Sequence, residues 1–191
     1  MPPKAKITRE MIIEEAFHIA RTEGADKITA RRIAERLQCS TQPVLYHFAT
    51  VEEIKVAVYK WADEYHTGRL MSTEHDYEDP MLTIGMNYIR FAVEERNLFH
   101  MLFQSNEFSG ATLMDLVQLD ELKPMLEILA QEAEVTTDEA KEIFTTLAVF
   151  VHGYASLFAN NDMVYDEKLL IRSLTNVFYG AVYAVKESNN E

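Results

Sequence analysis

The spacing of apolar residues along the chain indicates α-helices from end to end. Between residues 9 and 23, Ile13, Ala16, Phe17 and Ala20 recur at the three- and four-residue intervals that define one face of a helix. Similar apolar stripes follow, and no segment makes a convincing strand. The predicted fold class is therefore all-α, with about nine helices at residues 9–23, 30–37, 41–47, 51–70, 80–95, 97–104, 115–133, 137–160 and 166–187.

Residues with helix-capping chemistry mark the ends of these segments. A side-chain oxygen at the N-cap accepts a backbone N–H that the first turn leaves without a helical partner. Gly24 follows the first predicted helix and supplies the left-handed conformation that ends many helices. The predicted N-caps are Thr8, Thr29, Ser40, Thr50, Asp79 and Thr136, and a glutamate follows Thr50 and Thr136 at capping-box spacing.

The first three predicted helices are short, and a tight turn at Gln38 and Cys39 separates the second from the third. This arrangement is typical of a helix-turn-helix motif. The major groove of B-DNA is about 12 Å wide and admits one helix, while a second helix braces it against the backbone. Residues 1–60 also carry 10 Lys and Arg against 8 Asp and Glu, whereas residues 61–191 carry 8 against 23. A chain with a net charge of −13 thus has its basic residues gathered where the motif lies.

The run from Ile28 to Phe48, ITARRIAERLQCSTQPVLYHF, resembles the DNA-binding domain of TetR-family transcriptional regulators. The resemblance continues through TVEEI at residues 50–54. It covers about residues 8–60 by motif, and the rest of the chain by helix number and length. It implies a homodimer that binds a palindromic operator in double-stranded DNA, with a small-molecule effector bound in the C-terminal domain. We therefore expect a ligand-responsive transcriptional regulator, and a repressor rather than an activator.

The resemblance also implies which residues contact DNA. Gln hydrogen-bonds adenine in a bidentate way, and Ser or Thr serves several base edges. Leu45 stands where the family usually has an aromatic residue, so the aromatic phosphate contact is expected to pass to Tyr46. Val51 stands where many members have Lys, and Lys55 is the nearest substitute. The expected groove-facing residues are Ser40, Thr41, Gln42 and Tyr46, the expected phosphate contacts are Thr29, Tyr46, His47 and Lys55, and Arg31 and Arg32 lie on the bracing helix.

The sequence predicts a helix-turn-helix domain at residues 1–50, a connecting helix at 51–71 and a ligand-binding and dimerisation domain at 72–191. The last of these opens on the acidic segment STEHDYED. Its helices mix aromatic side chains with isolated polar groups, which is the composition of a small-molecule pocket, although such side chains are also normal in a core. The candidate effector-binding residues are Tyr88, Phe91, Phe103, Gln104, Phe150, His152 and Tyr154.

The last two predicted helices carry small residues that permit close helix approach. In the TetR family, the two corresponding helices pair across a twofold axis into a four-helix bundle. We therefore expect a homodimer through these helices. The stripes concerned are Thr146, Val149, Gly153 and Ser156 on one helix, and Val177, Gly180, Ala181 and Ala184 on the other.

Composition narrows the remaining classes of protein. With 48% apolar and 26% charged residues among 191, the chain is typical of a folded globular protein. Its single cysteine, Cys39, cannot form an internal disulfide, and its polar N-terminus lacks the apolar core of a signal peptide, so we expect a cytoplasmic location. The apolar stretch at residues 143–159 contains Thr, His, Gly and Ser, and is predicted to be a buried helix rather than a membrane span.

Motifs for catalysis or cofactor binding are missing from the sequence. It contains no serine nucleophile elbow, P-loop or His-Glu-x-x-His zinc motif, so we expect no enzyme activity, no cofactor and no metal. The Glu15-x-x-His18 and Asp63-x-x-His66 spacings resemble those of di-iron bundles, but such bundles need two further inward glutamates, and we interpret both pairs as solvated helix faces. The alternative function is a helical adaptor whose acidic C-terminal domain binds a partner protein.

Overall fold

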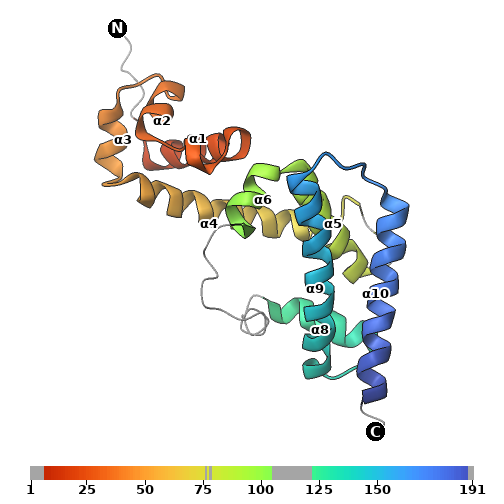
Figure 1. Cartoon of the computed structure of the whole chain (residues 1–191). Helices are drawn as coiled ribbons and strands as arrows, with labels where there is room; N and C mark the ends of the chain where they lie inside the picture. The colour runs from red at the N-terminus through yellow and green to blue at the C-terminus, as the bar shows by residue number, and fades with distance from the viewer. Residues whose placement is uncertain (1–6, 76, 78, 105–121, 189–191) are drawn as a thin grey trace. The chain divides into compact units, whose positions relative to one another are not determined.

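The computed structural model describes residues 7–75, 77, 79–104 and 122–188 (Figure 1). Within these ranges the chain forms nine α-helices and one short 3₁₀ turn, and no strand, which confirms the all-α fold class. The helices are α1 (Arg9–Glu23), α2 (Ala30–Arg36), α3 (Thr41–His47), α4 (Val51–Leu70), α5 (Pro80–Glu94), α6 (Arg96–Phe103), α8 (Lys123–Ala133), α9 (Thr137–Asn160) and α10 (Glu167–Ser188).

Most of the predicted caps hold their helices as expected. The hydroxyl oxygens of Thr8 and Thr29 accept the backbone N–H groups of Met11 (3.3 Å) and Arg32 (3.1 Å). Thr136 and Glu139 form a reciprocal capping box at the start of α9. Ser40 occupies the N-cap position of α3, but its hydroxyl makes no capping hydrogen bond, so that part of the prediction is wrong. The predicted helix at 115–133 is present from Lys123, and residues 115–121 lie outside the described part of the chain.

The chain divides into two compact units, whose boundary differs from the predicted one. The first comprises residues 1–68 and 95–105, and the second comprises 69–94 and 106–191. Residues 95–105, which the sequence placed in the C-terminal domain, belong to the first unit because α6 packs against α1. The first unit holds 11 Lys and Arg against 11 Asp and Glu, so the whole net charge of −13 lies in the second unit.

The core of the first unit is built from the apolar faces of its short helices. Ile12, Ala16 and Ile19 of α1 are fully buried, and Ile33 of α2 and Val44 of α3 close over them. Burial of these side chains supplies the hydrophobic stabilisation that a seven-residue helix lacks on its own, since isolated helices of this length are unstable in water. The fold thus fixes α2 and α3 by one buried face each and leaves their other faces to solvent.

The second unit packs α5, α8 and α10 around α9 (Figure 1). α9 is the one helix in the described ranges that is long and apolar enough to cross a membrane by length and composition. One of its faces, including Ile143, Leu147 and Val151, is buried in the hydrophobic core shared with α5, α8 and α10. The expected buried helix is thus found in part, because one face is in the core while only 28% of the most apolar window is buried.

Candidate nucleic-acid interface

Helix α3 presents an exposed face rich in hydrogen-bonding side chains. Val44 is fully buried and anchors the helix, while Thr41, Gln42, Leu45 and Tyr46 are exposed, Tyr46 to 82%. Residues three and four apart lie on one side of a helix, so these four side chains share a single face. Ser40 is also exposed at its N-terminal end. The structure therefore brings together all four residues expected to face a DNA groove.

The turn between α2 and α3 holds the two helices in a fixed relation. Gln38 adopts a left-handed conformation with φ of 51°, and the backbone N–H of Cys39 donates to the carbonyl oxygen of Ala34 at 2.9 Å. This geometry ends α2 and redirects the chain within three residues. α2 then packs against α3 as its brace, in agreement with the predicted helix-turn-helix.

The residues expected to contact phosphate lie around this face. Thr29 is exposed and its hydroxyl oxygen caps α2. His47 is partly buried, and its Nε2 lies 3.0 Å from the carbonyl oxygen of Ile7, which ties the start of the described chain to the end of α3. Lys55 lies in the first turns of α4, with Nζ 3.9 Å from Glu52. Arg9 stacks over the ring of Phe48 at 4.5 Å, which adds a cation next to the same end of α3.

Each arginine of α2 is paired with at least one carboxylate. Arg31 is 86% exposed and bonds Glu35, its neighbour one turn later. Arg32 makes a bidentate pair with Glu23 of α1, through Nε at 3.0 Å and Nη2 at 2.8 Å. The guanidinium of Arg32 holds the pKa of the Glu23 carboxyl below its usual range. The two arginines expected to contact DNA thus carry carboxylate partners in the structure.

A buried carboxylate joins α6 to α1 and α4. Glu95 is 5% exposed and accepts from Arg21 Nε (2.7 Å) and Nη2 (2.5 Å) and from the Tyr65 hydroxyl (2.9 Å). Asn97 Nδ2 donates to the carbonyl oxygen of Arg21 at 2.9 Å. A bidentate arginine and a third donor satisfy a carboxylate that would be costly to bury alone. These bonds give the physical reason why residues 95–105 belong to the first unit.

The candidate effector-binding residues are divided between the two units. Phe103 packs edge-on against His66 at 5.0 Å in the first unit, and Gln104 is exposed at the end of α6. Phe103 and Gln104 therefore belong to a different unit from Tyr88 and His152, and the expectation that all four line one pocket stays a prediction. Phe91 is buried to 1% exposure in α5.

The other five candidates lie in the second unit, with Tyr88 and Phe91 on α5 and Phe150, His152 and Tyr154 on α9. The Tyr88 hydroxyl lies 2.9 Å from Nδ1 of His152, whose Nε2 lies 3.2 Å from the hydroxyl of Ser156. Phe150 and Tyr154 meet edge-on at 5.1 Å along α9. Burial raises the pKa of Tyr88 and lowers that of His152, so both groups are held neutral. This chain of hydrogen bonds is the polar part of the candidate effector region.

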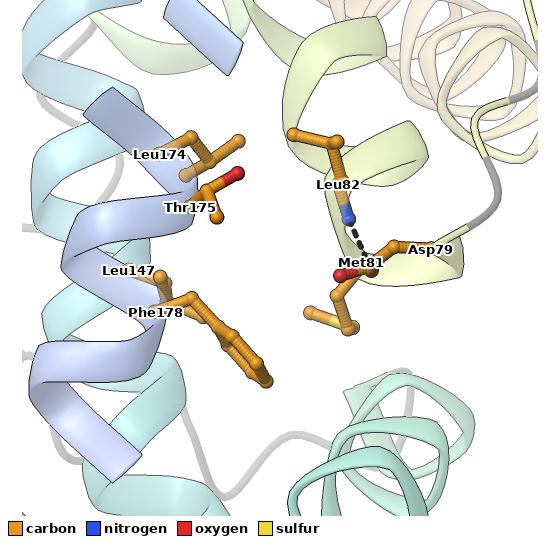
Figure 2. Close-up of a pocket in the computed structure, with 7 residues that line it drawn as sticks. All are labelled: Asp79, Met81, Leu82, Leu147, Leu174, Thr175 and Phe178. Carbon is orange, nitrogen blue, oxygen red and sulfur yellow. Dashed lines mark hydrogen bonds between the residues drawn. The ribbon is translucent and has the colours of Figure 1, made fainter. Parts of the chain in front are cut away.

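A small cavity of about 20 Å³ opens beside the core of the second unit (Figure 2). Its walls face one another across α5 and α10, with Met81 and Leu82 on one side and Leu174 and Phe178 on the other. Asp79 lines it from the N-terminus of α5, where its Oδ1 accepts the backbone N–H of Leu82 at 2.8 Å. A volume of this size holds about one water molecule, whereas effector sites measure several hundred Å³. None of the predicted effector-binding residues lines it.

Two buried polar residues of the first unit were not predicted from the sequence. Glu95 is one acidic residue among several in its segment, and only its tertiary partners reveal that it is buried. His66 is buried in α4, and burial lowers its pKa to about 4, so the expectation that it lies on a solvated helix face is wrong. Its spacing of four from Ala62 and eight from Val58 on the buried stripe was a usable signal.

No protein-family model matches the chain, and no curated protein matches it.

Proposed function

We propose that the chain is a sequence-specific DNA-binding transcriptional regulator that binds a palindromic operator as a homodimer and acts as a repressor controlled by a small-molecule effector. The observation that carries the proposal is the exposed face of α3, with Thr41, Gln42 and Tyr46 braced by α2. Seven residues of helix span about 10 Å, the length of about three stacked base pairs. The sequence resemblance to TetR-family regulators lies on the same residues.

The side chains on this face suit base-edge and phosphate contacts. Gln42 supplies the donor and acceptor that match adenine N7 and N6, and Thr41 serves several bases. Tyr46, Thr29 and Lys55 present hydroxyl and ammonium donors for phosphate, which fix register rather than sequence. A unit with equal numbers of acids and bases depends on such placed donors more than on its overall charge.

Exposed apolar stripes on α9 and α10 support the homodimer. On α9, Val149 and Leu157 are 57% and 49% exposed, with Gly153 between them. On α10, Tyr179 and Tyr183 are 65% and 67% exposed on either side of Gly180. A Cβ built on either glycine meets no atom within 4 Å, so a second chain has room to approach both backbones. A twofold dimer through these stripes suits half-sites about 34–36 Å apart or a multiple of that distance.

The proposed effector acts by selecting a conformation different from this one. A drug-sized molecule does not enter the cavity of about 20 Å³ between α5 and α10, so the proposed effector site is the region of Tyr88 and His152, which must open to admit it. The polar chain of Tyr88, His152 and Ser156 would then offer groups to orient it. Such a ligand shifts DNA binding only to the extent that it prefers the conformation with lower DNA affinity.

Selection of bound sequences from randomised DNA tests the proposal. The full chain should enrich a palindromic motif, and binding to this motif should weaken steeply as salt rises. If no sequence is enriched, the chain is better explained as the alternative, a protein-interaction adaptor that binds a basic partner through its acidic second unit.

A further inference from the structure

Helix α2 carries three arginines, all paired with carboxylates inside the first unit. Arg31 bonds Glu35 within the helix. Arg32 and Arg36 reach across to α1, and Arg32 keeps a weaker contact with Glu35 at 3.5 Å. Glu23 receives both of them, with Arg32 Nη2 at 2.8 Å and Arg36 Nη1 at 3.5 Å. Arg36 also bonds Glu15. The helix that braces a recognition helix therefore has its positive charge balanced from the neighbouring helix.

The position of Glu23 in α1 gives no reason for a carboxylate at this site. It is the last residue of α1, and the C-terminal end of a helix favours cations over carboxylates. Its stabilisation comes from Arg32, which lowers the pKa of its carboxyl, and from Arg36. The Glu23 side chain is 28% exposed, and those of Arg32 and Arg36 are 41% and 35% exposed. The arginines are thus accessible to an external anion while already bound to an internal one.

We propose that Glu23, supported by Glu15, competes with DNA phosphate for Arg32 and Arg36, and so sets the strength and the salt dependence of sequence-independent DNA binding. This inference rests on the proposed DNA-binding function. A guanidinium that neutralises phosphate releases a condensed counterion from the duplex, which supplies most of the free energy of non-specific binding. A guanidinium already held by a carboxylate must lose that partner first, so its contribution is reduced.

Replacement of the Glu23 carboxylate by an amide tests whether it competes with DNA phosphate. Glu23→Gln keeps the shape of the side chain and removes the charge that balances Arg32 and Arg36. One added phosphate contact steepens the slope of log K against log salt by about 0.9, which corresponds to about a 3.5-fold change in affinity over a fourfold range of salt. Two added contacts double the change in slope.

Glu14→Gln is the matched control. Glu14 lies on the same helix, is exposed, and has no ion pair in the described part of the chain, yet its replacement changes the net charge by the same single unit. The measurement is fluorescence anisotropy of a labelled 30-base-pair duplex of scrambled sequence, titrated with full-length protein at several salt concentrations between 50 and 200 mM. We expect a tighter complex and a steeper salt slope for Glu23→Gln, with the wild-type slope for Glu14→Gln.

A double variant tests whether Arg32 causes the change in salt slope. Glu23→Gln with Arg32→Ala should return the slope toward the wild-type value. If Glu23→Gln lowers the melting temperature so far that it does not fold, Glu15→Gln is used instead. It leaves Arg36 with only its 3.5 Å contact to Glu23, so it should give a change in slope in the same direction and of smaller size. Equal slopes for the folded Glu23 or Glu15 variant and Glu14→Gln would overturn the inference while leaving DNA binding intact. If wild-type protein binds neither scrambled nor selected DNA, both the inference and the proposed function are wrong.

Discussion

Gly85 is a position on α5 at which a side chain of α10 packs close to the backbone. A Cβ built on Gly85 lies 2.6 Å from Cδ2 of Leu174 and 3.6 Å from Cγ2 of Val151. Leu174 is 5% exposed and belongs to the core of the second unit, so its side chain can move only toward the small cavity that it lines. Gly85→Ala is therefore expected to force an overlap between the two helices, although alanine is the better helix former.

The size of the effect follows from two opposing terms. Alanine stabilises a helix interior by about 1 kcal/mol relative to glycine. Overpacking a buried site by one methyl group costs about 1–3 kcal/mol. The net change for Gly85→Ala is then a loss of up to about 2 kcal/mol in the free energy of unfolding. Gly68→Ala in α4, where a Cβ meets nothing within 4 Å, should gain up to about 1 kcal/mol.

Urea denaturation followed by circular dichroism measures both changes. In a background of Leu174→Ala, which itself costs about 2–5 kcal/mol, the overlapping methyl group is absent and Gly85→Ala should become stabilising. This change of sign is a coupling between two residues in contact. If Gly85→Ala stabilises the wild-type background as much as Gly68→Ala does, the packing of α10 on α5 described above is incorrect.

Three further predictions follow from other parts of the structure. Burial and the nearby Asp79 raise the pKa of Glu132 to about 7. The stability that its protonated form contributes is therefore complete below about pH 4.5 and is lost as the pH rises through about 7, a change of about 1 kcal/mol in the free energy of unfolding after solvent screening. Glu132→Gln should remove this part of the pH dependence of the urea midpoint. Gln42→Ala should weaken binding to the selected operator by about 1–3 kcal/mol and leave scrambled DNA unaffected in the anisotropy assay. In sedimentation velocity we expect a dimer for the wild type, as proposed, and a monomer for Val149→Asp with Leu157→Asp; a dimer in this variant would exclude the α9 stripe as its interface.

Local features of the fold were predictable from the sequence because local interactions determine them. The limits of α4 agree with the predicted 51–70, since Thr50 and Glu53 supply the chemistry of a helix start. Their bonding differs in detail, because the Glu53 carboxylate accepts the N–H of Ala49 at 3.0 Å. The face of α3 was also predictable, because one buried residue, Val44, determines which side chains remain exposed.

Long-range pairings were not predictable from periodicity. The sequence separation between Arg21 and Glu95 is 74 residues, and an amphipathic pattern in α6 does not indicate which neighbour it covers. The same limit applies to Phe103 and Gln104, whose residue types suit a ligand pocket and whose helix folds with the first unit. The pairing of Arg32 with Glu23 is a similar case, since a basic residue on a bracing helix gives no sign of its partner.

The central claim is that the exposed face of α3 recognises specific DNA sequences. The most direct test is selection from randomised DNA with wild-type protein and with the double variant Thr41→Ala and Gln42→Ala, each followed by anisotropy on the enriched and scrambled duplexes. The account predicts a palindromic motif for the wild type, and for the variant a loss of base preference with its affinity for scrambled DNA retained. Absence of any enriched motif, or the same motif with equal affinity for both proteins, would contradict it.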